Sequence, residues 1–390
     1  MKLAVYGLGK LGYPLANVFA RSGFHVVGID PVHHDEVPWE TIEPEVCWPE
    51  GSLERFSYSS APQPAAMSFI IVPTPSLTKG DRRGGFDSSY VEGALRQIRK
   101  VNEEGHIAVI ISTLSPGTCE EILDMPEVSG GRLKVVYNPT FIAIGQVIRN
   151  LVRPDMLLLG SREEDERETK KVKEVWFQVF DELGGMNHPF VHHGSLTEIE
   201  LIKLSFNCAL ATRISLGNSL GRLFEAYGVN PAAVSVLSHD HRIGIGYITP
   251  GSPIAGPCLP RDNQALQMAA IKKNLHLPLS VATEKVNHEL IESFYDRICG
   301  RDSDHVGHRP ASVGILGTSY KYGTDITTAS AGERIAQRLE AAGVHSVSYD
   351  DILQKDTLDQ VLDCQVVVVT QKEYDPLVTN HIGKVVRIWP

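Results

Sequence analysis

The stretch that decides the fold is LAVYGLGKLGYPLANVFARSGFHVVGID, residues 3–30. It begins with a short apolar run that predicts a buried strand, and a glycine turn, Gly7-Leu8-Gly9-Lys10-Leu11-Gly12, follows at once. A helical pattern and a second apolar strand come next, and that strand ends at Asp30. Strand, glycine turn, helix, strand and acid in this order are typical of a dinucleotide-binding βαβ unit.

The glycines and Asp30 also predict which dinucleotide binds. Gly7 permits the tight turn, Gly9 lets a pyrophosphate approach the backbone, and Gly12 lets the helix pack against the sheet. The phosphates would bind at the helix N-terminus, where N–H groups and the helix dipole favour anions. Asp30 would accept hydrogen bonds from ribose hydroxyls and repel a 2′-phosphate, so NAD is predicted rather than NADP. The alternative is a glycine-rich turn in another kind of α/β domain.

Further strands are expected at residues 68–72, 107–112, 135–137 and 156–159. Their alternation with helices predicts a parallel sheet that binds ligands at the carboxyl ends of its strands. Three polar loops would share that edge: Pro73-Thr74-Pro75, Ser112 to Thr118, and Asn138-Pro139-Thr140-Phe141. Any one of them could be ordinary turn chemistry, but three on one edge favour a site.

Residues 195–227 predict one long helix, which we also expect to form the core of a homodimer. A capping box at its start would come from one of two pairs, Ser195 with Glu198 or Thr197 with Glu200. Lys203 and Asn207 lie four residues apart on one face, and their donors suit a developing oxyanion during hydride removal from an alcohol. The alternative for Lys203 is a stem packed on apolar neighbours with its charge in water.

Cys258 is the candidate nucleophile among six cysteines. It follows Gly256-Pro257 and precedes a helix that we expect to begin near Asp262, and thiolates are favoured at helix N-termini. The remaining cysteines lie in helix or strand patterns and are predicted to be small buried residues: Cys47, Cys119, Cys208, Cys299 and Cys364.

The strand and helix pattern restarts after a polar linker at residues 300–310. Strands are expected at residues 312–317, 346–349, 366–369 and 385–388, with a helix through Ile335 and Leu339. This predicts a smaller doubly wound domain without the full glycine fingerprint, suited to a mononucleotide group. Lys321 is either a phosphate or base contact there or a solvated loop residue.

Composition excludes several classes of function. The 390 residues hold 37 Lys and Arg against 47 Asp and Glu, and a net charge of −10 argues against a nucleic-acid or anionic-membrane partner. The sequence has neither a long apolar span nor a signal-peptide pattern, and the cysteines show no Cys-x-x-Cys, so a cytoplasmic protein is expected. The histidine pairs lack carboxylate or cysteine partners at ligand spacing, so no metal site is predicted.

The whole layout resembles the UDP-glucose/GDP-mannose dehydrogenase family over nearly all of the chain. The motifs that carry the resemblance occur in the family's order, and the cysteine motif is the most specific of them: Gly7–Gly12 with Asp30, Val72-Pro73-Thr74-Pro75, Ser112-Thr113 with Pro116-Gly117-Thr118, Asn138-Pro139, Glu200 to Leu204 with Asn207, Arg242-Ile243-Gly244, Gly256 to Asp262, and Tyr320-Lys321 with Thr324-Asp325.

The resemblance implies three domains in an α/β chain. They are an N-terminal Rossmann NAD-binding domain at residues 1–194, a central helical substrate and dimerisation domain at 195–300, and a smaller C-terminal Rossmann-like, nucleotide-sugar-binding domain at 301–390. It also implies NAD-dependent oxidation of C6 of a nucleotide sugar, UDP-glucose-like, from alcohol to carboxylate.

The resemblance assigns roles to individual residues. Lys203 and Asn207 would stabilise the C6 oxyanion, and Cys258 would trap the aldehyde as a thiohemiacetal that becomes a thioester. Asp262 and Thr113 would position or activate water. The implied cofactor contacts are Gly7, Gly9, Lys10, Leu11, Gly12, Asp30, Pro73, Thr74 and Ser112. The implied substrate contacts are Phe141, Arg242, which would reach across a dimer, Tyr247, Gly256, Tyr320 and Lys321.

Several positions depart from the family pattern: Thr140, Ile144, Ser252, Pro253 and Thr328. Where the family shows Asn-Pro-Glu-Phe-Leu-x-Glu-Gly, this chain has Thr140 and Ile144 in place of both glutamates. The first glutamate is the family's acid/base for water, a role that threonine lacks. The sequence therefore leaves three alternatives beside four-electron oxidation: a two-electron reaction that stops at the aldehyde, a 3-hydroxyacid dehydrogenase, and a non-catalytic binder of nucleotide sugar and NAD.

Overall fold

The computed structural model describes residues 1–32, 53–77, 85–184, 188–241, 243–244, 250–300, 309–353 and 355–389. The chain divides into two compact units, residues 1–203 and 204–390. The predicted boundaries near residues 194 and 300 are finer than this division and stay a prediction.

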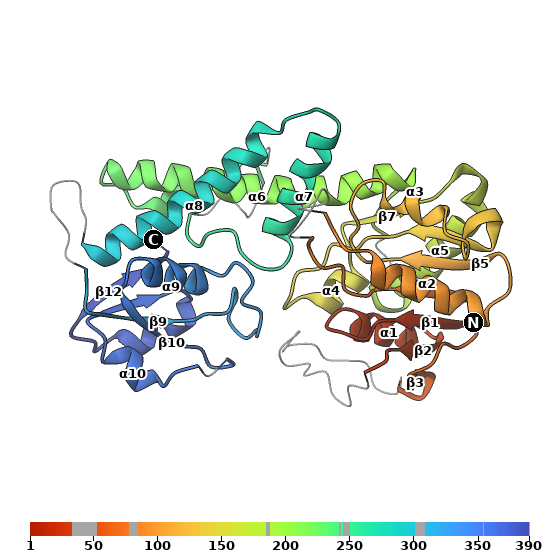
Figure 1. The fold of residues 1–390 in the computed structure, drawn as a ribbon, viewed down its shortest axis with the longest axis horizontal. Coiled ribbons are helices and arrows are strands. Elements are labelled where there is room, and N and C mark those ends of the chain that lie inside the picture. The colour runs from red at the N-terminus through yellow and green to blue at the C-terminus, as the bar shows by residue number, and fades with distance from the viewer. Residues whose placement is uncertain are drawn as a thin grey trace. The chain divides into compact units, whose positions relative to one another are not determined.

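The first unit is built on an eight-stranded sheet with the order β3-β2-β1-β4-β5-β6-β7-β8 (Figure 1). Its strands are β1 (Lys2–Tyr6), β2 (His25–Ile29), β3 (Phe56–Ser59), β4 (Met67–Ile70), β5 (His106–Ile110), β6 (Leu133–Tyr137), β7 (Met156–Gly160) and β8 (Phe190–Gly194). Helices α1 (Gly12–Arg21), α4 (Val147–Val152) and α5 (Glu166–Val179) pack on one face, with Phe19, Leu151 and Trp176 in the core. Helices α2 (Ser89–Val101) and α3 (Thr118–Leu123) and the start of α6 pack on the other, which confirms the doubly wound fold.

One pair of strands departs from the predicted parallel sheet. Strand β7 runs antiparallel to β6, with Tyr137 opposite Gly160, whereas the other neighbouring strands of this sheet pair in parallel. The connection between β6 and β7 contains only the six-residue helix α4, and it does not carry the chain back along the sheet as a parallel crossover would.

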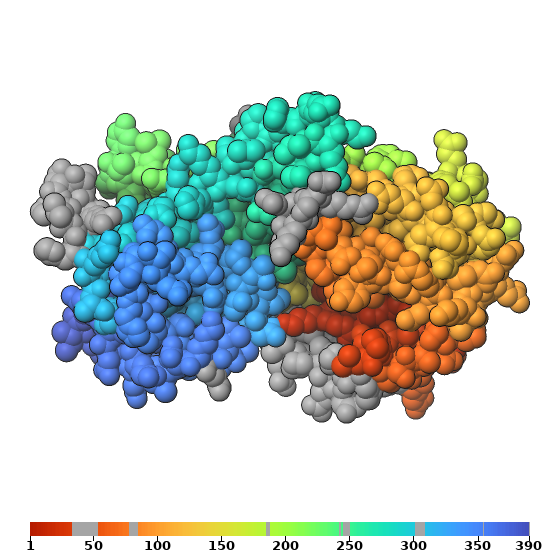
Figure 2. Space-filling view, in the orientation of Figure 1, coloured from red at the N-terminus to blue at the C-terminus, as the bar shows by residue number. Residues whose placement is uncertain are grey.

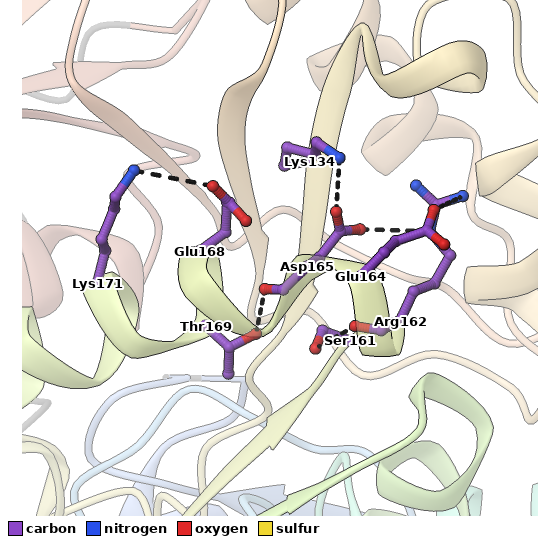
Figure 3. A network of polar contacts seen from close by, with 8 residues as sticks. All are labelled: Lys134, Ser161, Arg162, Glu164, Asp165, Glu168, Thr169 and Lys171. Atoms are coloured by element: carbon purple, nitrogen blue, oxygen red, sulfur yellow. Dashed lines mark hydrogen bonds and ion pairs between the residues drawn. The ribbon is translucent and has the colours of Figure 1, made fainter.

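A buried carboxylate fixes the end of the sheet at β6 and β7. Asp165 comes just before α5 and is fully buried, and its Oδ1 accepts a hydrogen bond from Lys134 Nζ on β6 at 2.6 Å. Its Oδ2 accepts from Arg162 Nε at 3.3 Å, while Arg162 also pairs with the exposed Glu164 (Figure 3). A buried carboxylate needs hydrogen-bonding partners, and two cationic side chains supply them here.

Helix α6 (Leu196–Ala226) confirms the predicted long helix and continues through residue 203 into the second unit. Of the two possible capping boxes, the structure forms the one between Ser195 and Glu198, in which each side chain accepts the other residue's N–H. The helix ends at Ala226, and Gly228 just beyond it has a φ of 69°, the left-handed C-terminal stop expected from the sequence.

The second unit joins helices to a four-stranded parallel sheet with the order β10-β9-β11-β12. Its helices include η6 (Pro231–His239), α7 (Leu259–Lys272), α8 (Pro278–Cys299), α9 (Ala331–Ala341) and α10 (Leu358–Leu362), and its strands are β9 (Ser312–Leu316), β10 (His345–Tyr349), β11 (Val366–Val369) and β12 (Lys384–Arg387). These strands confirm the predicted C-terminal Rossmann-like sheet. The α7–α8 connection lies on the surface, in teal (Figure 2).

The turn after β9 resembles the turn after β1, but a side chain of the protein already binds its N–H groups. Asp350 follows β10 and is buried, and its Oδ2 accepts hydrogen bonds from the N–H groups of Thr318 and Ser319 at 3.0 and 2.9 Å. The side chain of Ser319 donates to the same oxygen at 2.9 Å. Because these donors already occupy acceptor positions of Asp350, its carboxylate is a poor partner for the ribose of a second dinucleotide.

Candidate active site

The glycine turn between β1 and α1 has the shape that a pyrophosphate needs. Gly7 has a φ of 91°, and a Cβ on Gly12 would collide with the carbonyl oxygen of Gly7. A Cβ on the exposed Gly9 would meet nothing within 4 Å, so the turn is open where a ligand would approach. Leu11 is the N-cap of α1, with Lys10 just before it, and the first turn of α1 carries no acidic residue. This uncapped helix end is open to an anion.

Asp30 is tied to the same turn. Its Oδ2 accepts a hydrogen bond from Leu8 N at 2.8 Å, and its Oδ1 accepts from Val32 N at 3.0 Å. The carboxylate is only half-buried, unlike Asp350, so acceptor sites remain for ribose hydroxyls. The glycine turn, the helix end and Asp30 together fit NAD.

The loops after β4 and β5 come together as predicted, because these strands are neighbours. Ser112 is buried and its hydroxyl donates to Val72 O at 2.7 Å, directly before Pro73 and the buried Thr74. Ser115 accepts a hydrogen bond from Phe86 N at 2.9 Å. Thr113 lies between these anchors and is half-buried.

Lys203 is buried and does not extend its charge into water. Its side chain is 6% exposed, and Nζ donates to the carbonyl oxygen of Thr140 at 2.8 Å. The same nitrogen lies 4.5 Å from the centre of the Phe141 ring, a cation–π contact. Lys203 therefore holds the loop after β6 at Thr140.

Glu200 is a functional candidate that sequence reasoning used only as part of a motif. It is fully buried on α6, and its two carboxylate oxygens accept hydrogen bonds from Gly117 N at 2.6 Å and Cys119 N at 2.8 Å. Burial raises the pKa of Glu200 to about 6, although these bonds act in the opposite direction. In the sequence, this role was indicated by the spacing of three residues between Glu200 and Lys203.

In the second unit, Asn207 and Asp262 form a buried pair. Asn207 Nδ2 donates to Asp262 Oδ2 at 2.5 Å, and Asp262 Oδ1 accepts from Arg261 Nε at 3.1 Å. Asp262 is completely buried and Asn207 nearly so. The pair leaves a carboxylate oriented by an amide and a guanidinium.

Cys258 is the N-cap of α7, four residues before Asp262, and its thiol group is exposed. The helix begins at Leu259 rather than near Asp262, so the predicted start was three residues late. Because the helix begins one residue after Cys258, this cysteine lies directly at the helix N-terminus, where the partial positive charge favours a thiolate.

Gly256 and Tyr320 pack together beside this cysteine. Gly256 has a φ of 84°, and a Cβ there would lie 2.8 Å from the ring of Tyr320. Gly256 N donates to Thr328 O at 2.9 Å. Burial, with a smaller contribution from the charge of Cys258, raises the pKa of Tyr320 to about 12. Lys321 follows on the surface.

Two of the predicted substrate contacts, Arg242 and Tyr247, lie outside the described residues, as does Cys47. Cys119, Cys299 and Cys364 are buried as predicted. The prediction for Cys208 was wrong, because it is only half-buried and its Sγ donates to Asn263 Oδ1 at 3.2 Å. Within the described ranges, no three His, Cys, Asp or Glu side chains are grouped to hold a metal ion, and no helix is long and apolar enough to cross a membrane.

Comparison with known proteins identifies this arrangement. The family model for the NAD-binding domain of UDP-glucose/GDP-mannose dehydrogenases matches residues 1–180, and the model for the central domain matches residues 197–289. The chain belongs to the UDP-glucose/GDP-mannose dehydrogenase family. It is therefore an NAD-dependent nucleotide-sugar dehydrogenase.

Individual relatives agree with this assignment. UDP-glucose 6-dehydrogenase AglM of Haloferax volcanii is 27% identical over 387 residues, covering 93% of this chain and 86% of the relative. GDP-mannose 6-dehydrogenase of Pseudomonas aeruginosa is also 27% identical, covering 90% and 81%. The solved structure of a UDP-glucose dehydrogenase from Pyrobaculum islandicum superposes with a TM-score of 0.78 at 24% identity, covering 99% of this chain and 93% of that one. This last likeness supports the fold.

Proposed function

We propose that the protein oxidises C6 of a nucleotide sugar, of the UDP-glucose type, to the uronic acid in a four-electron reaction through Cys258. The observation that carries the proposal is an exposed cysteine at the head of α7 with the buried Asn207–Asp262 pair one turn further along. An aldehyde dehydrogenase step needs this combination, whereas a simple alcohol dehydrogenase step needs no nucleophile.

Individual side chains would have separate roles in this reaction. When bound, NAD supplies the acceptor for the hydride that leaves C6 at each oxidation. Lys203 and Asn207, four residues apart on α6, would stabilise the oxyanion that forms as the C6 hydroxyl loses its proton. The Cys258 thiolate would add to the aldehyde carbon and form a thiohemiacetal, and loss of a second hydride would leave a thioester.

Hydrolysis would complete the reaction. Asp262 would take a proton from water, which attacks the thioester carbon, and the C–S bond would break to release the carboxylate and regenerate the Cys258 thiol. The buried position of Asp262, fixed by Asn207 and Arg261, suits a base that must keep one orientation. Thr113 would help to place the water.

The relatives support the class of substrate. Their names specify UDP-glucose, GDP-mannose and UDP-N-acetyl-D-mannosamine as sugar nucleotides. A diphosphate is common to all three, and Lys321 and Tyr320 in the C-terminal part would contact the nucleotide side of such a substrate.

The test is a panel of nucleotide sugars with NAD, in which NADH is counted per sugar and the product is identified by mass. Two NADH per sugar and a uronic acid are expected. Fewer than two would overturn the four-electron proposal.

A second candidate, release of the 6-aldehyde after one oxidation, is favoured by the loop after β6. Thr140 and Ile144 provide no carboxylate there, and Lys203 is bound to the Thr140 backbone oxygen instead. This reaction would yield one NADH per sugar and a product that hydroxylamine traps.

We also propose a homodimer that forms through α6. Exposed apolar side chains follow one face of its second half and the turn beyond it: Leu216, Leu223, Tyr227 and Val229. Surface leucines in such a stripe are typical of a helix that packs against another helix. Because Cys258 must stay reduced to act, we infer that the protein works in a reducing compartment such as the cytoplasm.

A further inference from the structure

The loop that carries Thr113 is anchored by a buried carboxylate, Glu200. Glu200 reaches from α6 to the start of α3, where the N–H groups of Gly117 and Cys119 have no partner within their own helix. Each carboxylate oxygen accepts one of these N–H groups. Among the ion pairs of the described residues none includes Glu200, so its charge is held by backbone dipoles.

The other anchors of this loop are neutral. Ser112 donates to Val72 O, Ser115 accepts from Phe86 N, and Leu114 N donates to the hydroxyl of Tyr137 at 3.3 Å. They fix the first half of the loop. The second half passes through Gly117, which has a left-handed φ of 91° and is held at the backbone by Glu200.

Glu200 also links the loop to the catalytic helix. Lys203 lies three residues further along α6 and holds Thr140 in the loop after β6. One turn of α6 therefore fixes two loops of the same sheet edge, with Glu200 on one and Lys203 on the other. A change in either contact would alter the spacing between Thr113 and Lys203.

We propose that the ionised carboxylate of Glu200 is a positioning residue that holds the Thr113 loop in the shape that binds NAD. Neutralising it by protonation or by substitution releases the second half of the loop and weakens NAD binding. The inference deepens the proposed function, since it concerns the same site, but it rests on cofactor binding and not on the fate of the sugar.

The chemistry explains why the charge matters. A proton on either oxygen removes the negative charge and makes that oxygen a weaker acceptor, so its hydrogen bond from the N–H group weakens. Burial raises the pKa of Glu200 to about 6, and the groups that face it, Cys119 and Glu120 on α3, include no cation to oppose this. The bonds from Gly117 and Cys119 hold the pKa of the buried Glu200 down, so their loss would raise that pKa further while the side chain stays buried on α6. Protonation therefore favours the released loop, and we expect the contact to weaken as the pH falls through about 6.

The experiment compares Glu200→Gln with Glu198→Gln, a matched control two residues away that caps the exposed start of α6. The dissociation constant for NAD is measured from about pH 5 to about pH 8. We expect wild type and Glu198→Gln to bind more weakly as the pH falls. Glu200→Gln should bind NAD on the order of tenfold more weakly at neutral pH, with a flat profile below it.

Hydrogen exchange in the wild type supplies a second readout that needs no variant. After correction for intrinsic rates, the peptide 114–123 should lose protection between about pH 7 and pH 5, while β5 keeps its protection. Unchanged protection of this peptide, or wild-type NAD affinity and pH profile in Glu200→Gln, would overturn the inference. A protein that behaves as expected here but oxidises no nucleotide sugar would contradict the proposed function and leave this inference standing.

Discussion

Cys258 combines two properties that separate it from the other described cysteines, an exposed thiol and a place at the N-cap of a 14-residue helix. The helix dipole lowers the free energy of a thiolate there, while burial raises the pKa of Cys119 and Cys364 and keeps them protonated. Local structure therefore decides which thiol can react.

Replacing Cys258 by alanine should abolish the second oxidation. We expect NAD affinity to stay at the wild-type value, because the cofactor turn belongs to the other unit, and formation of the uronic acid to fall by roughly a thousandfold. Steady-state assays with a nucleotide sugar measure this. Cys364→Ala, in the C-terminal sheet region, is the control and should retain activity; equal activity in both variants would show that no covalent step occurs.

Tyr320 should act as a neutral group over the working pH range. Burial raises its pKa to about 12, so the phenol stays protonated below that pH and can donate a hydrogen bond but cannot serve as a base. Tyr320→Phe is therefore expected to leave the alkaline limb of the kcat/KM profile unchanged up to about pH 10. A limb that shifts in this variant, and not in the exposed control Tyr322→Phe, would show that the phenol titrates during turnover.

At the scale of elements, two glycines of the turn between β1 and α1 are expected to have different roles, Gly9 in cofactor binding and Gly12 in the stability of the fold. Gly9→Ala adds a methyl group that meets no protein atom, so we expect the free energy of unfolding to change by less than about 0.5 kcal/mol while NAD binding weakens. In Gly12→Ala the new Cβ collides with Gly7 O, and a loss of about 2 kcal/mol is expected. Urea unfolding and NAD titration of both variants test the distinction, which fails if both lose stability alike.

The network at Asp165 should contribute to the stability of the sheet. Asp165→Asn leaves Lys134 and Arg162 without their buried partner, and we expect about 2 kcal/mol less free energy of unfolding. Glu164→Gln removes only an exposed ion pair with Arg162 and should cost less than about 0.5 kcal/mol. Chemical denaturation measures both values, and a similar cost for both would mean that burial adds nothing to the Asp165 contacts.

The elements were predictable where the pattern is local. The βαβ unit, the long helix and the C-terminal strands all follow from short-range periodicity and glycine positions. The antiparallel β7 and the clamp by Glu200 were missed, since strand direction and contacts over 83 residues of sequence depend on tertiary packing. The predicted start of α7 was wrong by three residues, because the helix includes Pro260 in its first turn, where proline is well accommodated.

At the scale of the whole molecule, the proposed homodimer would form on an exposed apolar stripe of the second unit. Leu216 and Leu223 are seven residues apart on one face of α6, and they are 50% and 52% exposed. Tyr227 continues this stripe at 80% exposure. Water contact with so many large apolar groups is unfavourable, by about 25 cal/mol for each Å² of apolar surface.

We therefore expect Leu223→Glu to convert the proposed dimer into a monomer, because a carboxylate at the centre of the stripe would be buried without a partner. Light scattering after gel filtration should give twice the chain mass for wild type and the chain mass for the variant. Ile382→Glu is the matched control, since Ile382 is fully exposed on the loop before β12 and is not part of the apolar stripe of α6. If Leu223→Glu stays dimeric, the contact lies elsewhere. If wild type is monomeric, the apolar stripe must serve a different partner, and a sugar contact by Arg242 from a second copy would be excluded.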